Sequence, residues 1–135
     1  MKTILKSIVV VLGLALVVAM SHLALIEVGR EVVVLWTTDT SGDRHFRRLW
    51  VVDCEGAVWL HSTGESWHRL FEEHSTVELD RNGTLEKYSA AAIPGPHPQI
   101  DRALREKYGL ADRWVRFLAP DDENTLAVRL HKIGQ

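Results

Sequence analysis

Cysteine is almost absent from the sequence, in which Cys54 is the only one among 135 residues. A chain with one cysteine cannot form an intramolecular disulfide, so packing and hydrogen bonds must hold the fold. A nucleophilic thiol would also need a neighbouring base and an exposed position. Because a lone cysteine more often fills space as a small apolar side chain, we expect Cys54 to be a buried filler.

The sequence also lacks an excess of charge of either sign. It holds 16 lysines and arginines against 18 aspartates and glutamates, which gives a formal net charge of -2. Nucleic-acid-binding domains usually carry a basic face, so this balance argues against a nucleic-acid partner. Once a terminal segment is set aside, the length suits one small domain.

Motifs of several common enzyme classes are missing. The seven histidines show neither the H-x-x-x-H nor the HExxH spacing, and His61, His68 and His74 are spread over an expected strand and helix. We therefore expect no metal site. There is no glycine-rich nucleotide loop and no nucleophile elbow, which argues against a Rossmann domain and against an α/β-hydrolase.

A long hydrophobic run is present, from Ile8 to Ile26. As a helix it would reach about 28 Å, close to the hydrocarbon thickness of a bilayer. We therefore expect one transmembrane helix, with residues 1–30 as membrane anchor and linker and residues 31–135 as a separate domain. The alternative is a cleaved signal peptide, because Ala19-Met20-Ser21 is a small-x-small triplet. The apolar character that resumes at Leu23 favours the anchor.

The charges beside this run bear on its orientation in an inner or plasma membrane. Lys2 and Lys6 favour a cytoplasmic N-terminus and an external domain, whereas Arg30 favours the opposite arrangement. The linker from Glu27 to Glu31 is short, so we expect the domain close to the lipid bilayer. A small apolar acceptor would be available there.

The segment from residue 32 to residue 67 predicts three consecutive antiparallel strands. It consists of β-branched and aromatic runs that alternate with glycine-containing turns. The expected strands are Glu31–Thr38, Phe46–Val52 and Ala57–Ser62.

The rest of the chain predicts three more strands and three short helices. Asn82-Gly83 between two extended runs is a strong hairpin signal. The expected strands are Thr76–Asp80, Thr84–Ala92 and Thr125–Ile133, and the expected helices are Thr63–His74, one from Pro98 to Gly109, and one around Trp114, Phe117 and Leu118. The predicted fold class is mainly β (α+β), a small antiparallel barrel with short helices behind one N-terminal transmembrane helix.

Three stretches of sequence carry a resemblance: TTDTSGDRHFRRLWVV, GAVWLHSTGESWHRLFEEHSTVEL and EKYGLADRW. They resemble the split-barrel flavin- and deazaflavin-dependent reductases, the nitroreductase or pyridoxamine-phosphate-oxidase-like group, over Glu31 to Ile133. The resemblance implies a split β-barrel, bound FMN or deazaflavin, and reduction of a quinone-like or nitroaromatic acceptor. It also implies a homodimer with the cofactor at the subunit boundary.

Basic residues of the second expected strand, Arg44, His45, Arg47 and Arg48, are the first half of the candidate cofactor site. Arginine forks bind phosphate, which flavins and deazaflavins carry. Arg47 and Arg48 are neighbours on a strand and point to opposite faces, so at most one of them belongs to a given site. The alternative is that these arginines are solvated strand residues.

The second half of the candidate site is the expected helix start at Ser62, Thr63, Gly64 and Ser66. Free amides and hydroxyls at a helix N-terminus bind phosphate, and ordinary helix capping is the alternative role. Trp67 follows and could stack on a cofactor or belong to the core. No catalytic residue is identified. The predicted function is a membrane-anchored flavin- or deazaflavin-type oxidoreductase; the alternative is a non-catalytic split barrel, without such a cofactor, that binds a lipid, haem or a membrane-protein partner.

Overall fold

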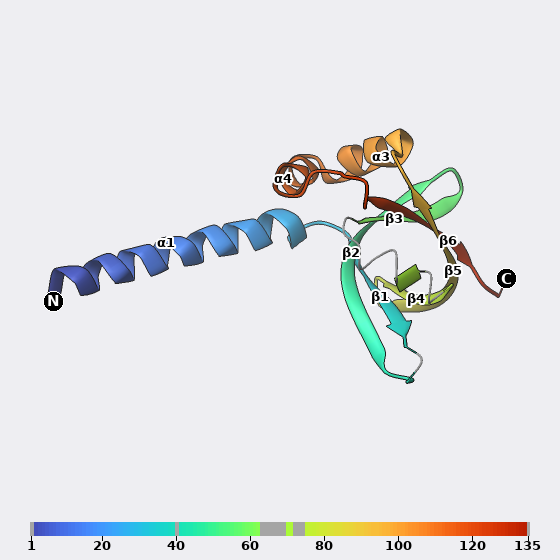
Figure 1. The fold of residues 1–135 in the computed structure, drawn as a ribbon, viewed down its shortest axis with the longest axis horizontal. Coiled ribbons are helices and arrows are strands. Elements are labelled where there is room, and N and C mark those ends of the chain that lie inside the picture. The colour runs from blue at the N-terminus through green and yellow to red at the C-terminus, as the bar shows by residue number, and fades with distance from the viewer. Residues whose placement is uncertain (1, 40, 63–69, 72–74, 135) are drawn as a thin grey trace. The chain divides into compact units, whose positions relative to one another are not determined.

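The computed structural model describes the whole chain except residues 1, 40, 63–69, 72–74 and 135 (Figure 1). The chain divides into two compact units, Met1–Arg30 and Glu31–Gln135.

The first unit is a single helix, α1 (Lys2–Glu27), followed by a turn. Gly29 takes a φ of +70°, the left-handed conformation in which helices commonly end. The stretch Ile4–Glu27 is long and apolar enough to cross a membrane by length and composition, and an N-terminal signal sequence would meet the same criterion.

The second unit is a closed antiparallel barrel. In the described residues its strands follow the order β1-β2-β3-β6-β5-β4 around the ring (Figure 1). They are β1 (Val32–Thr38), β2 (Arg44–Cys54), β3 (Ala57–Ser62), β4 (Thr76–Arg81), β5 (Thr84–Pro94) and β6 (Leu126–Lys132). The predicted fold class is confirmed, and the last strand closes the ring by pairing with β3 and β5.

Two expected strands were too short. The strand predicted at Phe46–Val52 is β2, which extends to Arg44 and Cys54 because it pairs with β1 at one end and with β3 at the other. β5 likewise continues to Pro94 along β6. Pairing partners therefore lengthen both strands beyond what their own alternation indicates.

Alternation along the strands fills the barrel. In β1, Val33 and Leu35 are buried, while Val34 between them is partly exposed. The interior cluster comprises Val33, Leu35, Val51, Leu60, Phe71, Val77, Leu79, Tyr88, Leu126, Val128 and Leu130. A small barrel is wide enough only for such side chains.

The expected helix Thr63–His74 lies largely outside the described residues. Of its apolar stripe, Leu70 and Phe71 are described and helical. Phe71 is buried in the barrel interior, and Leu70 packs against the same cluster.

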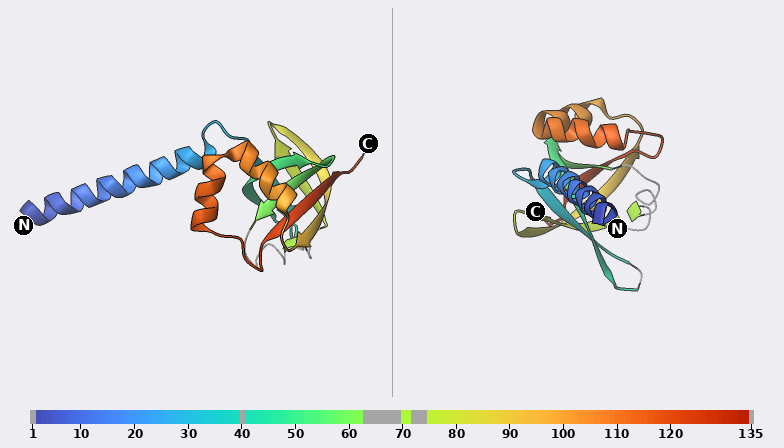
Figure 2. Two further views of the ribbon diagram at one scale, coloured as in Figure 1. Left: turned by 90° about the horizontal axis from the view of Figure 1, so that it is seen from above. Right: turned by 90° about the vertical axis from the view of Figure 1, so that its left-hand side faces the viewer.

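Two helices, α3 (Pro98–Tyr108) and α4 (Leu110–Leu118), lie on the outside of the barrel. They are neighbours in Figure 1 and in both views of Figure 2. Ile100, Leu104 and Tyr108 of α3 form a second apolar cluster with Val52 and Trp59 on the outer face of the sheet. The apolar face of α3 thus covers the barrel wall.

Tyr108 fixes the start of the barrel domain. Its hydroxyl lies 2.8 Å from the Glu31 carbonyl and 2.9 Å from the Val51 carbonyl, and it accepts the Val51 amide at 3.0 Å. The ring stacks on Trp50 at 4.4 Å between centroids. The hydroxyl therefore joins the chain entering β1 to β2.

An ion-pair network surrounds this point. The Arg81 guanidinium donates to both Glu31 oxygens, at 2.6 and 3.2 Å, and to both Asp53 oxygens, at 2.8 and 2.6 Å. Lys107 donates to Glu31 at 2.5 Å and to the Val51 carbonyl at 2.7 Å. The Arg81 hydrogen bonds are the main cause that lowers the pKa of Glu31 and of Asp53 below their ordinary values. β4, β2 and α3 are thus joined to the first residue of the domain.

Two hairpins turn through residue pairs with positive φ. Asn82 and Gly83 have φ of +55° and +80°, and Glu55 and Gly56 have +52° and +72°. Positive φ at both residues is the type I′ pattern, for which Asn-Gly is the preferred pair. The turn at Asn82-Gly83 confirms the predicted hairpin. Glu55 takes the left-handed conformation, which costs free energy for a residue with a Cβ atom.

We expect Glu55→Asn to raise the free energy of unfolding by about 0.5–1 kcal/mol, because asparagine accepts the left-handed conformation at lower cost. The matched exchange Asn82→Glu should lower it by a similar amount. Thermal unfolding of the full chain in detergent, followed by circular dichroism, measures both. Unchanged midpoints in the two variants would contradict this account of the turns.

We expect the stability of the barrel to fall in acid. Glu31 and Asp53 are more acidic in the folded than in the unfolded chain, so protonation favours unfolding. Their contribution is complete above pH 4.5, the ordinary value for glutamate, and is lost as the pH falls through the lowered folded values. Arg81→Met should cost about 1–3 kcal/mol at pH 7 and flatten this acid dependence. Arg102→Met, at an exposed position of α3, is the control that should leave the pH profile unchanged.

Candidate functional site

A cavity of about 560 Å³ lies beside the β1–β2 hairpin. Its described lining consists of Thr37, Asp39, Arg44, His45, Phe46, Arg47 and Leu70. Three of the residues predicted to bind a cofactor, Arg44, His45 and Arg47, are therefore together at one cavity.

Strand register places two of the lining residues, His45 and Arg47, on the inner face of the sheet. Arg47 is paired with Leu35 and His45 with Thr37, and cross-strand partners share one face of the sheet. Leu35 and Thr37 are buried on the barrel side. Arg47 and His45 therefore continue the inward-facing row past the packed interior. Arg48 is paired with Val34 on the other face and is not among the described lining residues.

Acidic side chains lie beside Arg44 and His45. Arg44 pairs with Glu78 of β4 at 2.5 Å, and its guanidinium lies 4.6 Å from the centre of the Trp36 ring. His45 Nε2 lies 2.9 Å from an Asp39 oxygen, and this hydrogen bond is the main cause that lowers the pKa of Asp39. An anionic ligand would compete with Glu78 and Asp39 for these two groups.

Most of the second half of the predicted site lies outside the described residues. Ser62 is the last residue of β3, where its backbone is paired with Leu126. Thr63, Gly64, Ser66 and Trp67 lie outside the described residues. Their role in phosphate binding stays a prediction.

A second cavity, of about 480 Å³, lies at the β2–β3 turn and is lined in part by Cys54, Tyr88 and His131. Cys54 is half-buried and packs against the second apolar cluster, so it fills space as expected but is not fully buried. Its carbonyl accepts the Trp59 indole N–H at 3.0 Å. Trp59 thus secures the turn from outside the barrel.

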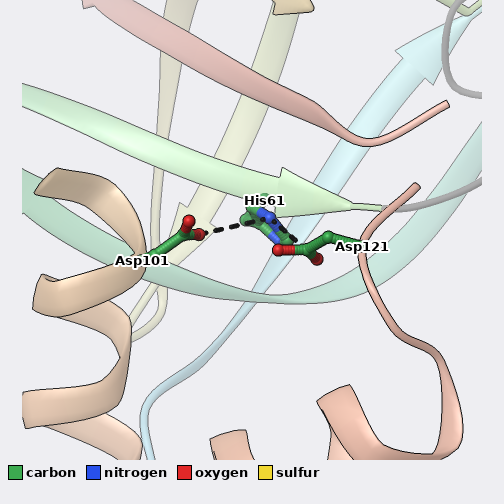
Figure 3. A group of neighbouring side chains, drawn as sticks. All are labelled: His61, Asp101 and Asp121. Atoms are coloured by element: carbon green, nitrogen blue, oxygen red, sulfur yellow. Dashed lines mark ion pairs between the residues drawn. The ribbon is translucent and has the colours of Figure 1, made fainter. Parts of the chain in front are cut away.

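The structure also brings together a cluster that sequence spacing did not indicate. His61 of β3 lies between Asp101 of α3 and Asp121, which follows α4 (Figure 3). Its Nε2 atom is 3.6 Å from an Asp101 oxygen and 3.5 Å from an Asp121 oxygen. The only signal in the sequence was the position of His61 on a strand, and its partners lie on distant elements.

Arg116 supplies the positive charge of this cluster. Its guanidinium donates to both Asp112 oxygens at 3.0 and 3.1 Å, to Asp101 at 2.9 Å, and also to Asp121. Burial lowers the pKa of His61, which favours the neutral imidazole. One nitrogen and two oxygens could hold a cation such as zinc. Arg116 already binds both carboxylates, so the described geometry is that of an ion-pair clamp.

We expect Arg116→Ala to lower the free energy of unfolding by about 2–4 kcal/mol, because it removes the cation that is hydrogen-bonded to buried Asp112 and that also binds Asp101 and Asp121. Arg105, whose Nε lies 3.7 Å from an Asp112 oxygen, then remains as the weaker cationic partner of Asp112. The loss should shrink in acid, as the pH falls through the lowered pKa of His61 and the protonated imidazole replaces part of the missing charge. Arg113→Ala, at an exposed position of the same helix, is the matched control. Equal denaturant midpoints for the two variants would show that Arg116 does not act as a clamp.

No protein-family model matches this chain, and no curated protein matches it. Several solved structures do. HutZ, a heme storage protein from Vibrio cholerae, has a TM-score of 0.60 and 13% identity over 79% of this chain and 84% of its own. An F420-H2 dependent reductase, FDR-A, has a TM-score of 0.53 and 15% identity over 72% and 92% of the two chains. A putative pyridoxamine 5'-phosphate oxidase from Listeria innocua has a TM-score of 0.51 and 16% identity over 83% and 90%. These structures are split-barrel proteins, and the chain has the split-barrel fold that its sequence resemblance predicted.

Proposed function

We propose that this chain is a membrane-anchored split-barrel protein that binds a flavin or deazaflavin cofactor and reduces a small acceptor. The observation that carries the proposal is the cavity beside the β1–β2 hairpin, where Arg44, His45 and Arg47 lie together. The fold adds support, because an F420-H2 dependent reductase shares it.

The packed barrel interior leaves this cavity, outside it, as the proposed ligand site. Eleven buried residues occupy the barrel interior in the described part of the chain, so a cofactor would bind at its mouth or on its wall. A volume of about 560 Å³ is within the usual range for small-molecule sites of about 300–1,000 Å³. Thr37 and Phe46 complete the described lining on the β1 and β2 strands.

The chemistry of the lining suits a phosphate-bearing ligand. Arg47 reaches the cavity from the inward-facing row, and an arginine fork is the common partner of phosphate. Arg44, which also lines the cavity, adds a second guanidinium when the ligand displaces Glu78 from its ion pair with Arg44. When bound, a flavin or deazaflavin supplies the hydride chemistry, while the protein binds and orients it.

The anchor bears on the acceptor. If α1 crosses an inner or plasma membrane, with the domain on its external side, the barrel lies near the bilayer and apolar acceptors such as quinones are within reach. A homodimer with the cofactor at the subunit boundary is part of the same proposal, on the ground of the resemblance alone.

One observation favours a second function, the binding of haem or another apolar ligand without catalysis. The structural similarity to a heme storage protein accompanies a histidine, His45, whose side chain is 61% exposed at the cavity. A visible spectrum of the purified full chain after incubation with FMN, F420 or hemin distinguishes the two. Spectra that match those of the free ligands in all three cases would contradict both functions.

The adjacent arginines provide a matched pair of variants. We expect Arg47→Ala to weaken flavin binding about tenfold or more, as loss of one charge-assisted hydrogen bond does. Arg48→Ala should bind like the parent chain, because Arg48 lies on the opposite face of β2. Titration of FMN fluorescence against the detergent-solubilised chain measures both affinities. Equal affinities for the two variants would refute the placement of the phosphate.

A further inference from the structure

Helix α4 turns its large apolar side chains outward. Leu110, Phe117 and Leu118 are 69%, 77% and 54% exposed, and Trp114 is 38% exposed. These four residues fall at i, i+4, i+7 and i+8, so they form one face of the helix, which we name the α4 apolar face. The buried side of the same helix holds Ala111 and the charged Asp112.

The clamp described above fixes this orientation. Arg116 binds Asp112 on its own helix, Asp101 on α3 and Asp121 beyond α4. Because these pairs hold the polar side of α4 against the domain, the helix cannot roll to bury its apolar face without breaking them. The α4 apolar face is therefore a stable feature of the surface.

This face begins close to where the chain enters the domain. The Tyr108 hydroxyl lies 2.8 Å from the Glu31 carbonyl, and α4 starts two residues later at Leu110. Only Val28 to Arg30 connect Glu31 to the end of α1. Three residues span at most about 10 Å. If α1 crosses a membrane, Glu31 therefore lies close to the membrane surface, and the N-terminal end of α4 lies near Glu31.

The residues of this region suit a lipid interface. Tryptophan and phenylalanine are favoured at the boundary between headgroups and acyl chains. Arg113 on α4, and Arg102 and Arg105 on the neighbouring helix α3, are exposed. Cations near the surface bind anionic headgroups. The apolar face and its basic neighbours together match an anionic bilayer.

We propose that the α4 apolar face inserts into the headgroup region of the same bilayer in which α1 anchors the chain. The domain then binds the membrane at a second point. This inference rests on the anchoring part of the proposed function and not on its cofactor. A second copy of the chain is the weaker alternative occupant, because a standard protein interface takes about 20 residues from each partner and this face offers four.

A single fluorescent label tests the proposal. Cys54→Ser removes the only cysteine, and Phe117→Cys then carries an environment-sensitive dye in the full chain, reconstituted into phosphatidylcholine–phosphatidylglycerol vesicles. Phe46→Cys is the matched control, since Phe46 is 61% exposed. It belongs to the β1–β2 hairpin, which extends away from α3 and α4 in Figures 1 and 2.

We expect the dye at residue 117 to emit at shorter wavelength than the dye at residue 46. Nitroxide-labelled lipids should quench the dye at residue 117, and aqueous iodide should quench the dye at residue 46. Equal iodide quenching at both positions would overturn the proposal. A second result would also overturn it. If the dye at residue 117 is protected from iodide but not quenched by labelled lipid, and the unlabelled Phe117→Cys chain forms a disulfide between two copies, then a second copy covers the face.

Flotation of the same vesicles distinguishes anchoring by α1 from insertion of the α4 apolar face. A chain that remains with the lipid after an alkaline wash is anchored, and the dye at residue 117 then decides the inference alone. A chain released by the wash refutes the anchor, and the inference with it. The cofactor spectra are recorded in detergent and do not depend on either outcome.

Discussion

Closure of the hydrogen-bonded sheet is the constraint on which the rest of the structure depends. Because the ring is closed, with β1 paired to β4 and β6 paired to both β3 and β5, each described strand has two neighbours. Alternate residues of a strand then point into the barrel. The inward positions hold leucine, valine and aromatic side chains that fill the space. In the described residues, the cavity beside the β1–β2 hairpin and the ion-pair cluster around Arg116 therefore lie outside this filled interior.

Two arginines organise that outer layer in the same way. Arg81 joins Glu31 to Asp53, and Arg116 joins Asp101, Asp112 and Asp121. A planar guanidinium has donors on several edges, so one side chain can satisfy carboxylates from different elements. The first cluster fixes the entry of the chain and the second fixes α4. The outer helices are thus positioned by ionic geometry as well as by apolar packing.

The sequence predicts the strands well because alternation and turn glycines are local signals. It also shows that Arg47 and Arg48 face opposite ways, but only the pairing of Leu35 with Arg47 reveals which of them faces the cavity. The cluster around His61 escaped prediction because its members come from three elements that meet only after the barrel closes. For α4 the periodicity gives a stripe of large residues, and nothing local tells whether a neighbour covers it.

The grip of Tyr108 on the backbone of Glu31 has a mechanical meaning. If α1 crosses a membrane, any force that the tether transmits enters the domain at residue 31. There it meets the hydroxyl of Tyr108, the ammonium of Lys107 and the guanidinium of Arg81 at once. The load is shared among β2, β4 and α3, so β1 is not peeled from the sheet one hydrogen bond at a time.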